Sequence, residues 1–100
     1  SDDMIVTGGE NVYLNVVGDA VRAISGVSDA YVLGVASPEW GTEIVAVVVS
    51  GRPEAALDAA VRDTLAPHEI PKRWVKLDRL PMLDNHKHDR AALQRVAELG

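Results

Sequence analysis

The chain has 100 residues and a mass of 10.7 kDa, which is the size of one domain. Hydrophobic residues make up 47% and charged residues 25%, and the mean hydropathy is +0.01, so we expect a soluble folded domain. The net charge of −5 argues against nucleic acid or an anionic membrane surface as the partner, and the absence of cysteine excludes a disulfide framework and a thiolate metal site.

No segment resembles a transmembrane helix or a secretion signal. The longest apolar run, residues 44–49, is far shorter than the roughly 20 residues that span a bilayer. The acidic start, Ser-Asp-Asp, lacks the basic and apolar parts of a signal peptide and does not begin with Met. We therefore expect a cytoplasmic protein, of which this chain is a piece.

The first quarter of the chain predicts a strand and a helix. An apolar run at residues 4–6 stops at two glycines, Gly8 and Gly9, which predicts a short strand followed by a loop. From Asn15 the apolar residues recur at helical spacing as far as Ile24, and Gly26 follows as a stop.

The middle of the chain predicts two strands and a second helix. Residues 27–35 are rich in β-branched side chains, residues 37–41 have turn chemistry, and residues 44–49 form a continuous apolar run. This order predicts two strands joined by a loop. Pro53 then suits a first helical turn, and apolar residues recur every four positions, at 57, 61 and 65.

The last third predicts a third strand, a polar loop and a closing helix. Residues 73–78 alternate, with Val75 and Leu77 on one side. Residues 80–88 have no period and predict a loop, after which Asp89 is a good N-cap. The predicted class is α+β: one domain, residues 1–100, with a small sheet of about three strands, helices packed against it, and a short N-terminal strand and loop.

The polar loop contains the residues best suited to ligand binding or catalysis. Lys87 stands at its tip, where a flexible ammonium can meet several anionic oxygens, although a solvated surface lysine has the same appearance. His86 and His88, with Asp84 and Asp89, suggest metal binding, but a catalytic zinc normally recruits three defined protein ligands, and we favour a loop without metal. No nucleophile elbow or phosphate-binding fingerprint is present, so the residues alone leave the function undecided.

Four segments, in this order, carry a family resemblance. They are Gly-Gly-Glu-Asn-Val-Tyr within residues 2–13, Gly-Val-x-Asp-Ala-x-Val-x-Gly-Val at 26–35, Pro-Glu-Trp-Gly at 38–41 before an apolar strand, and a closing Leu-Pro, Lys and Asp-Arg-Ala-Ala-Leu within 80–93. Together they resemble the mobile C-terminal domain of the AMP-forming adenylating enzymes, which include acyl-CoA synthetases, luciferases and peptide-synthetase adenylation domains. The first segment points to the acyl-CoA synthetase branch.

The resemblance implies roles for five residues. Lys87 matches the catalytic lysine that bridges the substrate carboxylate, the α-phosphate and the ribose during adenylation. Asp2 matches the hinge about which the domain swings between an adenylating and a thioester-forming pose. Gly8, Gly9 and Glu10 match the loop that lines the pantetheine channel of coenzyme A in the second pose.

The resemblance also implies substrates and a partner. ATP, coenzyme A and a carboxylic acid would be the substrates, and Mg²⁺ would come with ATP. The phosphate loop and the acid pocket would belong to an N-terminal adenylation domain of the same protein, so that the 100 residues alone should be inactive. Fatty acids, aryl acids and o-succinylbenzoate all stay open as substrates.

An alternative is a degenerate or free-standing domain with an interaction or regulatory role. Three departures from the family pattern support it. His86 replaces the usual glycine before the lysine, and Val16 and Gly18 stand where acidic residues usually open the first helix.

Overall fold

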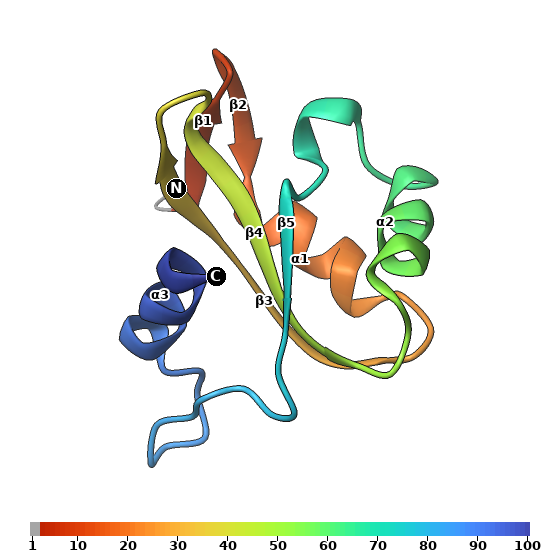
Figure 1. The fold of residues 1–100 in the computed structure, drawn as a ribbon, viewed down its shortest axis with the longest axis vertical. Helices are drawn as coiled ribbons and strands as arrows, with labels where there is room; N and C mark the ends of the chain where they lie inside the picture. Colours follow the sequence, from red (N-terminus) through yellow and green to blue (C-terminus); the bar gives the residue numbers. More distant parts are fainter. Residues whose placement is uncertain (1–2) are drawn as a thin grey trace.

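A three-stranded sheet forms the centre of the computed structural model, which describes residues 3–100 (Figure 1). The strands are β3 (Val27–Ser37), β4 (Gly41–Ser50) and β5 (Arg73–Lys76), in that order. β3 and β4 are antiparallel neighbours, whereas β5 runs parallel to β4 and is reached through a crossover. That crossover contains α2 (Glu54–Arg62) and a 3₁₀ turn, η1 (Pro67–Glu69). The predicted α+β class with three strands is confirmed.

Helices cover both faces of this sheet (Figure 1). α1 (Leu14–Arg22) and α2 pack on one face, and α3 (Arg90–Leu99) packs on the other. Because successive side chains of a strand point to opposite faces, positions 44, 46 and 48 of β4 face α1 and α2, while positions 45 and 47 face α3. This double cover explains why the apolar run in β4 has no polar positions at its centre.

The N-terminal segment is a hairpin of β1 (Met4–Thr7) and β2 (Glu10–Tyr13). The expected first strand is present, and the segment expected to be a loop contains a second strand. Gly8 and Gly9 have φ values of 55° and 82°. Positive φ at both positions of a two-residue turn is typical of type I′, whose twist matches that of the flanking strands. Val12 is 1% exposed and joins the core beside α1.

The helices α1 and α2 are shorter than the segments in which apolar residues recur at helical spacing. α1 ends at Arg22, and Ile24 packs into the core from the turn that follows. Gly26, expected to stop the helix, lies in the turn into β3 with φ 91°. Pro53 is the N-cap of α2, and Leu65 is buried three residues beyond its end. In residues 3–100 none of the helices has the length and apolar character needed to cross a membrane.

Several contacts fix α3 on the sheet. Asp89 is its N-cap, as predicted, and accepts a hydrogen bond from the backbone N–H of Ala92 at 3.1 Å. Leu93 and Ala97 are fully buried against the sheet. Arg73 of β5 pairs with Glu43 of β4 at 2.7 Å and also donates to the carbonyl oxygen of Ala97 at 2.7 Å. The helix is therefore firmly attached to the sheet.

Candidate functional site

The lysine loop, residues 81–89, projects from one end of the long axis of the molecule (Figure 1). Its backbone closes on itself. The N–H of Leu83 donates to the carbonyl of Lys87 at 2.7 Å, and the N–H of Asp89 donates to that of Pro81 at 2.9 Å. Met82 and His88 form an isolated antiparallel bridge between the two arms. The loop is therefore a narrow hairpin-like turn, and Lys87 lies on its returning arm.

Two local features form the turn at its tip. The N–H of Lys87 donates to the side-chain oxygen of Asn85 at 3.1 Å, as asparagine often allows in turns. His86 has φ 66°, in the left-handed region that glycine adopts with least strain. In residues 3–100 it is the single non-glycine residue with positive φ. A histidine thus adopts a backbone conformation that glycine adopts more readily.

The ammonium of Lys87 is free to meet a ligand. The side chain is exposed, and among the described residues no hydrogen bond or ion pair involves its Nζ. Beside it lies an open hollow of about 640 Å³. The hollow is lined by Tyr31, Leu83 and residues 86–91. A cation beside an open hollow can approach an anion that is bound to another domain or protein.

Two of the four residues considered for a metal have other partners. Nε2 of His88 lies 2.9 Å from Oδ1 of Asp29, which is on β3, and Asp89 caps α3. His86 and Asp84 are exposed. In residues 3–100 the structure brings together no group of three or more histidine, cysteine or acidic side chains that could hold a metal ion.

The turn of the β1–β2 hairpin lies at the opposite end of the molecule from the lysine loop (Figure 1). The N–H of Gly8 donates to the carbonyl of Trp40 at 3.0 Å, and a Cβ on Gly8 would lie 3.0 Å from the Trp40 ring. Apart from Gly9 and its two chain neighbours, no atom of residues 3–100 lies within 4 Å of a Cβ added at Gly9. Glu10 pairs with His68 of η1 at 3.3 Å. The hairpin turn is thus anchored at Gly8 and open at Gly9.

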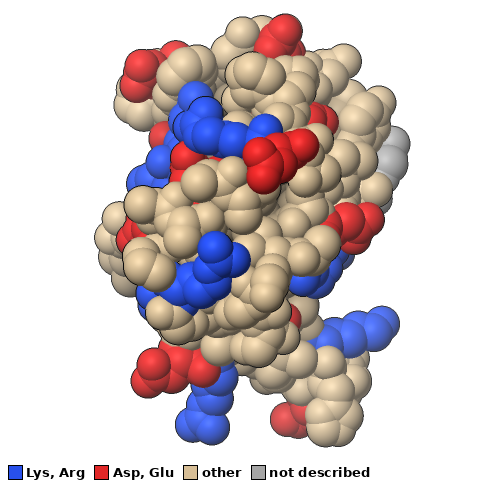
Figure 2. Space-filling view, turned by 90° about the vertical axis from the view of Figure 1, so that its right-hand side faces the viewer, with Lys and Arg blue, Asp and Glu red and all other residues tan. Residues whose placement is uncertain are grey.

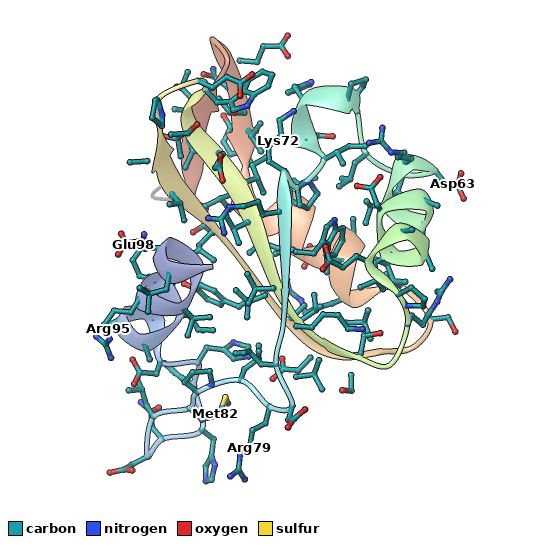
Figure 3. All side chains as sticks on the ribbon, viewed as in Figure 1. Asp63, Lys72, Arg79, Met82, Arg95 and Glu98 are labelled. Atoms are coloured by element: carbon teal, nitrogen blue, oxygen red, sulfur yellow. The ribbon has the colours of Figure 1, made fainter. Side chains whose placement is uncertain are left out.

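The structure does not bring all the predicted site residues together. Lys87 is at one end of the molecule, whereas Gly8, Gly9 and Glu10 are at the other. In Figure 3, Met82 marks the end with the lysine loop. Asp2 lies outside the described residues.

Sequence reasoning missed three contacts near these loops. His88 binds Asp29 and stacks edge-on against Tyr31, with ring centroids 5.5 Å apart. Lys72 lies over the ring of Trp40 at 4.0 Å from its centroid, close to the hairpin turn. Each contact joins residues distant in the sequence, and no local pattern indicates such pairs. On the face shown in Figure 2, basic and acidic side chains are interspersed.

Comparisons of sequence identify the family. The model of the AMP-binding enzyme C-terminal domain matches residues 17–87. The 4-chlorobenzoate–CoA ligase of Pseudomonas sp. strain CBS-3 is 42% identical over 80% of this chain and 16% of its own length. A medium/long-chain-fatty-acid–CoA ligase of Mycobacterium tuberculosis is 36% identical over 92% of this chain and 18% of its own. A 2-succinylbenzoate–CoA ligase of Staphylococcus aureus is 34% identical over 93% and 19%. The chain therefore spans less than a fifth of these relatives.

Solved structures show the same fold. A fatty acyl CoA synthetase of Mycobacterium tuberculosis aligns with a TM-score of 0.87 and 28% identity, over 94% of this chain and 19% of that one. The apo MatB structure from Rhodopseudomonas palustris aligns with a TM-score of 0.86 and 29% identity, over 95% and 20%. In each case the similarity covers nearly all of this chain and a minor part of the larger protein.

Proposed function

Because the chain belongs to the AMP-binding enzyme C-terminal domain family, we propose that it is the C-terminal domain, residues 1–100, of an ATP-dependent, AMP-forming acid:CoA ligase. In the proposed reaction a carboxylic acid and ATP give an acyl-adenylate and pyrophosphate, and the thiol of coenzyme A then displaces AMP to give acyl-CoA. The names of the relatives support this reaction, since all three are CoA ligases. Their acids are a chlorobenzoate, fatty acids and succinylbenzoate, and we infer a fatty acid or a succinylbenzoate-type acid here.

The rest of the machinery belongs, in this proposal, to an N-terminal adenylation domain of the same cytoplasmic protein. The matched segment makes up 16%, 18% and 19% of the three relatives' lengths. In residues 3–100 no group of three or more histidine or acidic side chains is arranged to hold a metal ion, and we assign no step to Mg²⁺ on this domain. ATP, its Mg²⁺ and the acid would all bind the larger domain.

The observation that carries the proposal is the exposed ammonium of Lys87, which lies on a closed loop and has no partner within residues 3–100. In adenylation a carboxylate attacks the α-phosphorus of ATP, so two anions must meet and negative charge shifts among the phosphoryl oxygens. A positioned cation offsets that repulsion in the transition state, where it lowers the barrier. Lys87 would supply this cation to a site on the larger domain.

The hairpin turn would serve the second step. Gly8 and Gly9 have no side chains, and the space around Gly9 is open, which leaves room for the narrow pantetheine arm of coenzyme A beside Glu10. Because this turn and the lysine loop lie at opposite ends of the domain, one site can meet them only in turn. We place the hinge for that rotation at Asp2.

Carboxylate-dependent exchange of labelled pyrophosphate into ATP tests the adenylation reaction. The full-length protein is incubated with ATP and a panel of acids: medium and long fatty acids, benzoates and o-succinylbenzoate. We expect exchange with at least one fatty or succinylbenzoate-type acid, and acyl-CoA when coenzyme A is added. A folded full-length protein that supports exchange with no acid of the panel would overturn the proposed reaction.

A non-catalytic interaction domain is the second candidate, and the strained His86 beside Lys87 favours it. The two candidates differ in what precedes Ser1 in the gene. Several hundred codons with a phosphate loop rich in serine, threonine and glycine would support the ligase. A start codon close to Ser1 would support the interaction domain.

A further inference from the structure

The residue after Lys87 is tied to the central sheet. Nε2 of His88 lies 2.9 Å from Oδ1 of Asp29 on β3, 59 residues away in the sequence. A carboxylate oxygen can only accept, so Nε2 carries the proton. The His88 ring also stands edge-on to Tyr31, with centroids 5.5 Å apart and planes inclined at 62°. Both contacts come from the same face of β3, because Asp29 and Tyr31 are two residues apart.

The acceptor is itself held in place. The register between β3 and β4 shifts between Val27 and Asp29, so that no β4 residue lies opposite Ser28 in the ladder. Such a bulge re-aims the side chains around it. Oδ1 of Asp29 also accepts a hydrogen bond from the backbone N–H of Ala30 at 2.9 Å. This hydrogen bond orients the carboxylate independently of His88. The Asp29 carboxylate is therefore a preset attachment point on the sheet.

The two sides of Lys87 differ in how they are constrained. On the side of His86 the backbone turns through a strained left-handed conformation at the exposed tip. On the side of His88 the side chain is only 27% exposed and bonded to the sheet. The lysine side chain has no partner among residues 3–100, and its backbone is bonded only within the loop, so the neighbouring His88 provides the side-chain link from Lys87 to the sheet.

From this geometry we propose that the His88–Asp29 pair, backed by Tyr31, positions Lys87 for adenylation, an inference that rests on the proposed function. His88 and Asp29 are positioning residues, since they act through Lys87 and not on the substrate. Without the pair, the loop would sample orientations in which the ammonium misses the reacting phosphate. The pair would have no role in thioester formation, for which the lysine loop is carried away.

The test compares variants of the full-length protein in pyrophosphate exchange. We expect His88→Val and Asp29→Ala to lower kcat by about tenfold with KM for ATP and the acid unchanged, as for the loss of one charged hydrogen bond that orders a loop. His88→Gln should recover most of the activity, because its amide Nε2 can take the place of the imidazole Nε2. Asp58→Ala is the matched control: it removes a carboxylate of similar exposure, 31% against 36%, from an ion pair on α2.

A double-variant cycle separates positioning from general destabilisation. If His88 acts only through Lys87, then adding His88→Val to Lys87→Ala should cost no further activity. A further tenfold loss in that background, or an equal loss in thioester formation from preformed acyl-adenylate, would overturn the proposal. If Lys87→Ala alone leaves adenylation intact, the proposed function fails instead.

Hydrogen–deuterium exchange tests the attachment without any catalysis. The N–H groups of Leu83, His86 and Asp89 are bonded within the loop, so their exchange reports how often it opens. We expect faster exchange in peptides covering residues 82–90 for His88→Val and Asp29→Ala, but not for Asp58→Ala. Unchanged exchange in both pair variants would show that the loop does not depend on the pair.

Discussion

At the scale of single residues, His86 combines a Cβ with a left-handed backbone of φ 66°. That combination costs on the order of 1 kcal/mol, and more for a β-branched side chain. We therefore expect His86→Gly to raise the free energy of unfolding by up to about 1 kcal/mol, and His86→Val to lower it by roughly 1–2 kcal/mol. Urea unfolding of the 100-residue chain measures both changes.

Asp84→Gly is the control for the strain at His86. Asp84 is exposed in the same loop and has no positive φ, so glycine there should only add freedom to the unfolded chain and lower the free energy of unfolding by about 0.5–1 kcal/mol. A loss of the same size for His86→Gly would show that the histidine is not strained.

Single residues were predictable from the sequence where the cause is local. Asp89 was predicted as an N-cap because the capping hydrogen bond joins residues three apart. The contact of His88 with Asp29 joins residues 59 apart and depends on a bulge in β3, so no spacing in the sequence indicates it. The exposed Lys87 was predictable as a loop residue, while its function came from a resemblance.

At the scale of elements, the sequence indicated β1 and the order of the later strands and helices, but not β2. Only Val12 is buried in β2, so the alternation that marks a strand is nearly absent there. The signal that could have shown the hairpin is the pair Gly8 and Gly9, since two glycines between extended segments favour a type I′ turn.

Gly9→Ala tests whether the hairpin turn lines the thiol channel. An added Cβ at Gly9 meets no atom of residues 3–100, so a clash would come from outside the domain. We expect thioester formation from preformed acyl-adenylate to fall about tenfold and adenylation to stay unchanged, because a misplaced thiol slows only the second step. Stopped-flow or quenched assays of the two half-reactions measure this.

Gly41→Ala is the matched control for that variant. Gly41 also has a positive φ, 79° against 82°, and also has open space around its added Cβ. The two substitutions therefore carry similar backbone strain at different turns. If both variants slow thioester formation equally, the effect is due to strain and the channel assignment is wrong.

At the scale of the whole molecule, a sheet covered on both faces carries two distant loops. The continuous burial of residues 44–48 in β4 has two causes that lie in different parts of the chain, α1 with α2 on one face and α3 on the other. The sequence predicted helices against a sheet but not which face each covers, because that depends on the crossover before β5.

The lysine loop and the β1–β2 hairpin turn lie at opposite ends of a domain that is 35 Å long. This separation relates the fold to the two proposed half-reactions. A rigid domain with one functional loop at each end can serve a single site only by turning around. The central claim of the account is that one of these ends, with Lys87, serves adenylation alone.

Lys87→Ala in the full-length protein tests this claim most directly. Pyrophosphate exchange measures adenylation, and acyl-CoA formation from preformed acyl-adenylate measures the second half-reaction. Arg79→Ala is the control, since it removes another exposed cation at the same end of the molecule (Figure 3). We predict that Lys87→Ala lowers adenylation by about 100-fold or more, as for the loss of one positioned charge, and largely spares thioester formation. Equal losses in both half-reactions, or unchanged adenylation, would contradict the account.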